Sequence, residues 1–265
     1  MHPILLKLGP ITIHTYGALL ALGAALGLWL LNRLARKSGL DPEKMGTLAI
    51  WVLISGLVGS RIAFVAIEYK HFASNPLRMF YIWDGGLVFY GGVAAALVVG
   101  LWLARRWRIP LLPTLDCAAP ALALGQAIGR FGCFAAGCCY GKPWEGWCAV
   151  VFRDPHTLAP PGVPLHPTQL YTAAALFAIL GILLWFRPRR RFPGQIFFSY
   201  GLLHGIARFI IEQFRGDWRG EPLMPGLTPT GAFALALAIF SAIMLIYLAV
   251  KSKQEKGPHG VSPGS

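Results

Sequence analysis

Apolar residues occur along the chain in seven long runs that short polar segments separate. Most runs are close to the ~20 residues that an α-helix needs to cross the hydrocarbon of a bilayer. None shows the alternation of polar and apolar positions that is typical of outer-membrane barrel strands. The pattern therefore predicts an all-α integral membrane protein with seven transmembrane helices. The predicted spans are residues 12–32, 46–66, 85–104, 112–132, 169–186, 195–214 and 227–250.

The segments between the runs set the expected domain organisation, which is one polytopic membrane domain over residues 1–250. The longest connection, residues 142–166, holds two tryptophans and several prolines, so we expect it to fold as an extracytoplasmic cap. Residues 251–265 end in glycine, proline and serine and are predicted to be a disordered cytoplasmic tail. The positive charges near the first apolar run follow it instead of preceding it, and the run is long enough to cross the membrane. We therefore expect a transmembrane helix and not a cleavable signal peptide.

Charge supports the membrane assignment and gives an orientation. Only 13% of the 265 residues are charged, against about 25% in soluble domains. The net charge of +13 could indicate nucleic acid, but 14 of the 24 lysines and arginines fall in every second connection. Such clustering follows the positive-inside rule. It predicts an N-terminus outside and a C-terminus in the cytoplasm, with no nucleic-acid partner.

Arg130 lies near the end of the fourth predicted span, within the glycine-rich segment 129–141. A charge inside a span costs at least ~2.5–3.5 kcal/mol, so an anion, a counter-charge or a wet cavity has to accommodate it. Glycines let backbone or ligand approach closely, and Gln126 lies one turn earlier on the same side. We interpret this segment as one wall of a lipid-phosphate site. Its candidate residues are Gln126, Gly129, Arg130, Cys133, Gly137 and Gly141.

The sixth predicted span carries a polar stripe of His204, Arg208, Glu212 and Arg215, spaced i, i+4, i+8 and i+11. Polar residues within a span usually face the bundle interior and mark function. The alternative is that Arg208 and Glu212 only neutralise each other, although this order is the weaker one for a helical ion pair.

Three features near the predicted outer ends of spans have two interpretations each. Tyr16 is either an interfacial aromatic or a hydrogen-bond donor to phosphate. Arg61 either snorkels to the headgroups or contacts substrate. Two Gly-Gly pairs around Tyr90 indicate either irregular backbone in the membrane, tolerated only against protein or a wet cavity, or a turn before the third span. The glycines are Gly85, Gly86, Gly91 and Gly92.

Four of the five cysteines, all except Cys117, cluster between residues 133 and 148, at or beyond the predicted outer membrane face. Three interpretations remain open. Cys148 forms a disulfide with Cys138 or Cys139, since that side of a bacterial membrane is oxidising. The cysteines bind a metal, although their spacing matches no zinc pattern. They pack as small apolar side chains.

Several separated motifs together resemble the bacterial prolipoprotein diacylglyceryl transferase family. The resemblance covers nearly the whole chain. Its motifs are the segment 129–141, Arg61, the glycine pairs of 85–92, the segment His166-Pro167-Thr168-Gln169-Leu170-Tyr171, and the stripe of Arg208, Glu212 and Arg215.

The resemblance implies transfer of diacylglyceryl from phosphatidylglycerol to the lipobox cysteine of a prolipoprotein in the bacterial cytoplasmic membrane. A thioether forms and glycerol phosphate leaves. Arg130 and Arg208 correspond to the family's essential arginines, while Tyr16, Gly141 and Glu212 match further family positions. His166 and Gln169 are carried over as substrate-binding candidates, and no metal or cofactor is expected.

The chemistry of the residues agrees with this expectation. Two guanidinium groups on facing helices can hold a phosphate and stabilise the charge that builds on it. The substrate thiol, with a free pKa near ~8.5, needs a base or a positive field to become a thiolate.

The chain departs from the family pattern at several site positions. Cys133, Ala136 and Cys138 replace the family's usual polar residues, Tyr90 stands where many members have histidine, and His204 where many have tyrosine. We hypothesise that the last two have exchanged roles. His204 would then assist thiol deprotonation, because histidine titrates near neutral pH, and Tyr90 would donate a hydrogen bond to the phosphate.

Two other functions are alternatives to the transferase. A phospholipid-headgroup transporter or binding protein could use the same arginines, but a transporter would be expected to contain inverted repeats, which the sequence lacks. A membrane thiol-redox protein would need a Cys-x-x-Cys motif, and Cys138 and Cys139 are adjacent instead.

Overall fold

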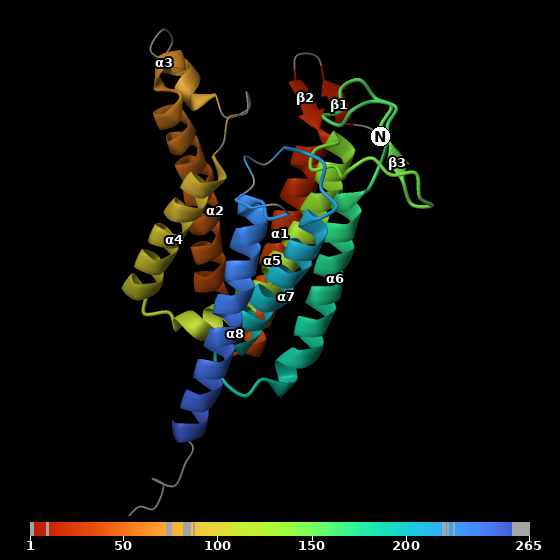
Figure 1. Ribbon diagram of the computed structural model, residues 1–265. Helices are drawn as coiled ribbons and strands as arrows, with labels where there is room; N and C mark the ends of the chain where they lie inside the picture. Colours follow the sequence, from red (N-terminus) through yellow and green to blue (C-terminus); the bar gives the residue numbers. More distant parts are fainter. Residues whose placement is uncertain are drawn as a thin grey trace, which may run out of the picture. The chain divides into compact units, whose positions relative to one another are not determined.

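Helices make up most of the chain that the structure describes (Figure 1). The computed structural model describes residues 3–8, 11–72, 76–81, 86, 88–218, 221, 223–224 and 226–255. The helices are α1 (Thr15–Lys37), α2 (Pro42–Ile67), α3 (Tyr69–Phe72), η1 (Pro76–Phe80), α4 (Phe89–Arg106), α5 (Leu111–Ala136), α6 (Thr168–Phe186), η3 (Arg187–Arg189), α7 (Gln195–Glu212) and α8 (Pro229–Glu255). The strands are β1 (Ile4–Leu8), β2 (Ile11–His14), β3 (Val150–Val151) and β4 (Pro164–Leu165).

Each of the seven predicted spans contains a helix. Among the described residues, six helices are long and apolar enough to cross a membrane: α1, α2, α4, α5, α6 and α8. The protein is therefore an all-helical integral membrane protein in its main architecture. The remaining helix, α7, is 18 residues long and carries the polar stripe. Seven spans and their orientation stay predictions.

The ends of the helices differ from the predicted limits at several places. Residues 11–14 form β2, which pairs with β1 as an antiparallel hairpin before α1 begins, because Ile-Thr-Ile favours a strand. Helix α4 begins at Phe89 instead of 85. Helix α8 continues to Glu255, so the predicted tail begins as helix, and residues 256–265 lie outside the described part.

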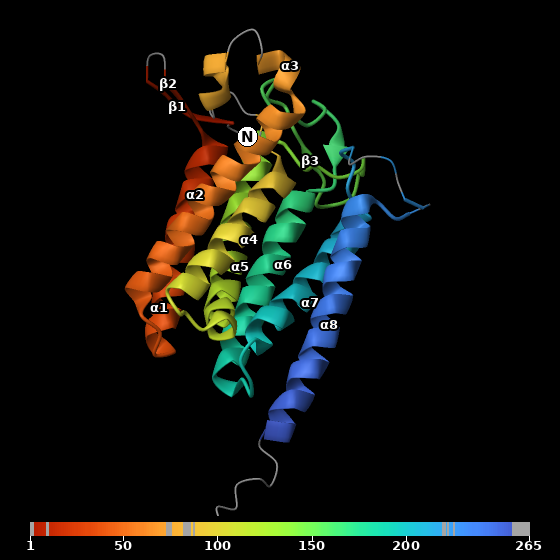
Figure 2. The same cartoon turned by 90° about the vertical axis from the view of Figure 1, so that its left-hand side faces the viewer.

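The chain forms two compact units, and the single membrane domain over residues 1–250 stays a prediction. One unit comprises residues 31–114, and the other comprises residues 1–30 and 115–265. In the first unit, α2 and α4 lie side by side (Figure 2). Their backbones approach so closely that a Cβ added at Gly92 would lie 2.8 Å from the carbonyl oxygen of Gly56. Small residues at such positions let membrane helices pack tightly.

The second unit has a core between α5, α6 and α7, built from alanines of α5 and larger apolar residues of the other two helices. Asp116 of α5 joins two of these helices, because its buried carboxylate accepts hydrogen bonds from the backbone of Gly194 (2.8 Å) and Phe197 (3.0 Å) at the start of α7. Helix α8 packs along α7. A Cβ at Gly23 of α1 would lie 2.7 Å from the carbonyl oxygen of Gly125 in α5, so these helices also meet closely.

Residues 142–166 contain a small core of Phe152, Ala159 and Leu165, and their place as an extracytoplasmic cap stays a prediction. Strands β3 and β4 pair within this segment. It returns to the helices at Gly141, whose backbone N–H donates to the carbonyl oxygen of His166 (3.1 Å).

Candidate active site

Arg130 and Arg208 belong to the same unit and come from α5 and α7. These helices are linked in the site region by Tyr200, whose hydroxyl donates to Oε1 of Gln126 (2.9 Å). His204 stacks on Tyr200, with 5.3 Å between ring centroids, and the charges of both arginines act on His204. The structure thus brings Gln126, Arg130, His204 and Arg208 together.

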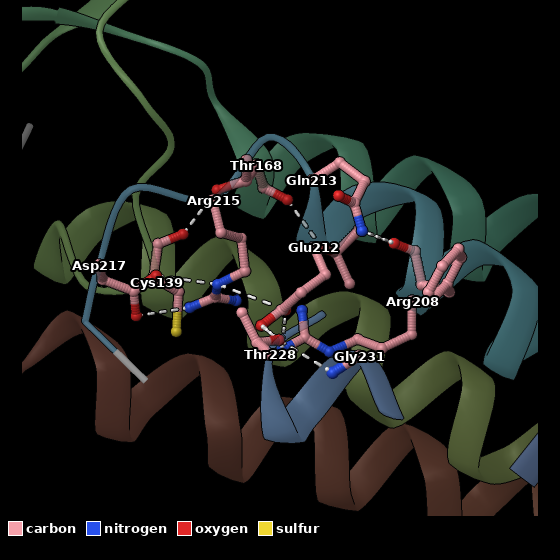
Figure 3. A network of polar contacts seen from close by, with 11 residues as sticks. Cys139, Thr168, Arg208, Glu212, Gln213, Arg215, Asp217, Thr228 and Gly231 are labelled. Carbon is pink, nitrogen blue, oxygen red and sulfur yellow. Dashed lines mark hydrogen bonds and ion pairs between the residues drawn. The ribbon is translucent and has the colours of Figure 1, made fainter. Parts of the chain in front are cut away.

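Glu212 lies at the centre of the polar network in Figure 3. Its carboxylate is 2.8 Å from Nη2 of Arg208 and 4.0 Å from Nε of Arg215, and it accepts a hydrogen bond from the Thr228 hydroxyl (2.9 Å). The Glu212 side chain is only 2% exposed. The neutralising pair that the sequence left as an alternative is therefore present, but it is one part of a larger network.

Arg215 lies just after α7 and faces the end of α5 (Figure 3). Its guanidinium forms a bidentate pair with Asp217, at 2.9 and 2.7 Å, and hydrogen-bonds the Cys139 thiol. Burial opposes its charge, yet the bonds to Asp217 and Cys139 raise the pKa of Arg215 above that of an ordinary arginine. Such a pair remains charged at every physiological pH.

Gly141 allows the backbone segments around Arg215 to cross. A Cβ at this position would lie 2.5 Å from the carbonyl oxygen of His166 and 2.9 Å from that of Phe214. The neighbouring Lys142 N–H donates to the Phe214 carbonyl (2.8 Å), and Gly216 N–H donates to that of Tyr140 (3.1 Å). Only glycine fits this crossing, which gives Gly141 a structural role beside the predicted one.

Cys133, Cys138 and Cys139 converge in space, with their sulfur atoms all within 4.8 Å of one another. Helix α5 ends between them in a Schellman motif, in which Gly137 has a φ of 70° and Cys138 N–H donates to the Cys133 carbonyl (3.1 Å). Hydrogen bonds from Cys133 and Cys138, followed by the charge of Arg215, lower the pKa of the Cys139 thiol. Hydrogen bonding with its two neighbours, with burial, raises the pKa of Cys138.

Residues from the start of α6 hold this turn. The hydroxyl of Thr168 donates to the Cys139 carbonyl (2.6 Å), and Nε2 of Gln169 donates to that of Cys138 (2.7 Å). Both side chains are almost fully buried. Gln169 thus holds the cysteine turn, and its predicted role in substrate binding stays a prediction. His166 stacks on Trp144 with 4.3 Å between ring centroids, and burial followed by the charge of Lys142 lowers its pKa.

Tyr16 lies at the start of α1 in the same unit as the arginines, and 41% of it is exposed. The charge of Arg130 and the three clustered cysteines all act on it. A Cβ at Gly132 would lie 3.2 Å from the Tyr16 carbonyl oxygen, so α1 and α5 are in contact here. By contrast, a Cβ at Gly129 would meet only Leu20, at 3.9 Å.

The other candidates belong to residues 31–114. Arg61 is buried and donates to the backbone carbonyl oxygens of Arg78 (2.7 Å), Met79 (2.8 Å) and Gly86 (3.1 Å). Gly91 and Gly92 lie in the first turn of α4 and pack against α2, so the backbone is regular there. Tyr90 is exposed, and Gly85 lies outside the described residues.

All five cysteines are unbridged in the structure. The Cys148 thiol lies 3.3 Å from the Tyr171 hydroxyl, and Cys117 is buried beside Arg187, whose Nη2 is 3.6 Å from the sulfur.

Sequence reasoning did not single out Asp217 or Thr228 as members of the site, and Thr168 entered it only as part of the family-like segment 166–171. Thr168 and Thr228 contact residues distant in sequence, Cys139 and Glu212. Asp217 contacts Arg215 within the segment that follows α7. The one signal for Asp217 in the sequence was its position two residues after Arg215 of the polar stripe.

These features define an integral membrane protein in which two arginines of neighbouring helices, Arg130 and Arg208, lie close enough for both charges to act on His204. The family model of prolipoprotein diacylglyceryl transferase matches residues 3–248. The chain is 32% identical to the phosphatidylglycerol–prolipoprotein diacylglyceryl transferase of Clostridium tetani, over 91% of this chain and 96% of that protein. It is 32% identical to the one of Gloeobacter violaceus, over 97% and 96% of the two chains. The chain therefore belongs to the prolipoprotein diacylglyceryl transferase family.

Proposed function

We propose that the protein transfers the diacylglyceryl group of phosphatidylglycerol to the lipobox cysteine of prolipoproteins. The observation that carries this proposal is the placement of Arg130 and Arg208 on two packed helices, where both charges act on His204. Two relatives from the genus Clostridium, at 32% and 31% identity, are named for this activity. A protein that only binds phospholipid headgroups would share the arginines, but no observation favours it.

The reaction replaces one bond at a glyceryl carbon with another. The substrate sulfur attacks that carbon, the bond from the carbon to the phosphodiester oxygen breaks, and glycerol phosphate carries the electron pair away. Arg130 and Arg208 would hold the phosphate and stabilise its added charge, an effect that grows in a site of low dielectric. The thiol loses its proton as the thioether forms.

We assign proton removal to His204 and a phosphate hydrogen bond to Tyr90, the exchange of roles that the sequence suggests. His204 stacks on Tyr200 within reach of both arginine charges, and Tyr90 is exposed at the start of α4. A base has to be neutral to accept a proton, so the rate should fall as the pH decreases through the titration of His204. Near-normal turnover of both His204→Ala and His204→Gln at pH ~6–8 would contradict the assignment.

The membrane arrangement that we propose has seven spans. They are the six apolar helices together with α7. Polar residues within a span are tolerated where they face the bundle interior. The N-terminus would lie outside and the C-terminus in the cytoplasm of the bacterial inner membrane, because the basic connections alternate. Residues 142–166 would then form an extracytoplasmic cap.

The test uses purified protein, phosphatidylglycerol labelled in its acyl chains, and a lipobox peptide. Label should reach the cysteine peptide but not a peptide with serine in its place. Arg130→Ala and Arg208→Ala should each lower the rate by about 10²–10³-fold, as loss of a transition-state donor does. Arg153→Ala removes an exposed arginine from the cap and serves as the matched control. Lipid binding without any transfer would favour the headgroup-binding function.

A further inference from the structure

We propose that Cys133, Cys138 and Cys139 form a binding site for a thiophilic d¹⁰ cation, Zn²⁺ or Cu⁺. Their three sulfur atoms lie within 4.8 Å of one another. Thiolate sulfur is the ligand that selects copper(I) and zinc among the biological metals. This inference is independent of the proposed transferase function, which requires no metal.

The separation of the sulfur atoms suits a single ion. With Zn–S bonds of ~2.3 Å, the ligand sulfurs of a tetrahedral site are about 3.8 Å apart. The three thiols therefore need to move together by an ångström or less. Among the described residues, no further cysteine, histidine or acidic side chain belongs to this group. Three-coordinate Cu⁺, or Zn²⁺ with a fourth position open to water, matches such a ligand set.

The backbone holds the three thiols in this arrangement before any ion binds. The Schellman turn at the end of α5 folds Cys138 back over Cys133, and Cys139 has a φ of 62°, which is uncommon for a residue other than glycine. Thr168 and Gln169 fix the carbonyl groups of Cys139 and Cys138 at 2.6 and 2.7 Å. Strained backbone that surrounding contacts enforce is characteristic of functional sites.

The charges around the cluster also suit an anionic metal–thiolate complex. Three thiolates with one divalent ion leave a net charge of −1, and with one monovalent ion −2. Arg215 hydrogen-bonds Cys139, and the charge of Arg130 acts on Cys133. Groups that hydrogen-bond the ligand atoms orient them and stabilise the metal complex. All three cysteines are partly accessible, so an ion can reach them.

A disulfide explains the cluster less well. Adjacent residues have Cα atoms ~3.8 Å apart across a trans peptide, below the ~4.4–6.8 Å that disulfides usually span. A bridge between Cys138 and Cys139 would therefore be strained. A disulfide from Cys133 to Cys138 or Cys139 would use only two of the three clustered thiols and would not explain why the third lies beside them.

The test is a metal titration of the full-length protein in detergent under anaerobic conditions, after reduction with a phosphine. Zn²⁺ and Cu⁺ are added separately in competition with a chromophoric chelator. We expect one ion per chain and an ultraviolet thiolate-to-metal charge-transfer band for at least one of the two ions. Comparing the two affinities identifies which ion the site prefers.

Single cysteine substitutions locate the site. Cys133→Ser, Cys138→Ser and Cys139→Ser should each weaken binding by at least about tenfold, whereas Cys117→Ser and Cys148→Ser, which lie outside the cluster, should retain it. Circular dichroism of each variant shows whether it is folded. Equal binding by the cluster variants and the controls would overturn the proposal, as would a folded wild-type protein that binds neither ion. Recovery of a Cys133 disulfide from protein never exposed to reductant, with no metal bound after its reduction, would also overturn it.

Discussion

Asp116 is predicted to be the residue that fixes the arginine helix against its neighbour. It lies in α5 and is fully buried, yet its carboxylate caps the start of α7, 78 residues later, through the backbone N–H groups of Gly194 and Phe197. Arg190 lies 3.9 Å from the same carboxylate. Asp116→Ala should therefore destabilise the protein. It should also loosen the packing of α7, which carries Arg208, against α5, which carries Arg130.

The expected magnitude follows from the bonds that are lost. Hydrogen bonds to a charged group contribute about 1.5–3 kcal/mol each, and a buried N–H left without a partner adds a desolvation cost. The lost interaction with the helix dipole contributes up to about 2 kcal/mol in buried geometry. Because these terms overlap, we expect Asp116→Ala to lower the free energy of unfolding by about 3–4 kcal/mol. Asp116→Asn keeps one acceptor and should have an intermediate effect.

Asp41 offers a matched control, because its carboxylate caps α2 through the N–H groups of Glu43 and Lys44 (3.0 and 3.3 Å) but is exposed to solvent. Asp41→Ala should cost only about 1 kcal/mol, as exposed caps do. Thermal unfolding in detergent, followed by circular dichroism, compares the variants. If Asp116→Ala were no more destabilising than Asp41→Ala, the argument that burial strengthens this cap would be refuted.

Two further substitutions test the site itself. Gly141→Ala should lower transfer by at least about tenfold, because its Cβ would collide with two backbone carbonyls and displace their segments. A Cβ at Gly181 of α6 would meet nothing within 4 Å, so Gly181→Ala should stay within a few-fold of wild type. Glu212→Ala should destabilise the protein by about 3–5 kcal/mol in thermal unfolding, because Arg208 would lose its buried counter-charge. The exposed Gln213→Ala should change stability by less than about 0.5 kcal/mol, and an equal loss in both variants would contradict this argument.

Much of the fold could be predicted from the sequence, because apolar runs of membrane length have few alternatives to a helix. Arg130 and Arg208 were recognisable for the same reason, since a charge in such a run is costly. The cap of α7 by Asp116 was not predictable, because it is a hydrogen bond between residues far apart in the chain. For the glycines at 91 and 92 the sequence left irregular backbone and a turn before the third span as alternatives, whereas the structure places them in the close packing of two helices.

The cysteine cluster could not be predicted from the sequence either, although its three residues lie close together in the chain. Spacing in the sequence matched no metal motif, because such motifs assume that the chain between ligands follows a familiar turn. Here the turn is made at Gly137 and Cys139, both with positive φ, and is held from α6 by Thr168. Periodicity cannot reveal such a turn.

The polar stripe of α7 divides into two parts with different roles. His204 and Arg208 lie toward Arg130, where the charges act together, and Arg215 lies toward Asp217 and Cys139. An arginine has five N–H donors, and Arg215 uses three of them in a bidentate ion pair and a thiol hydrogen bond. We therefore expect Arg215 to act mainly as a positioning residue. Glu212, between the two arginines, connects both parts, so its replacement should disturb the phosphate site and the cysteine cluster together.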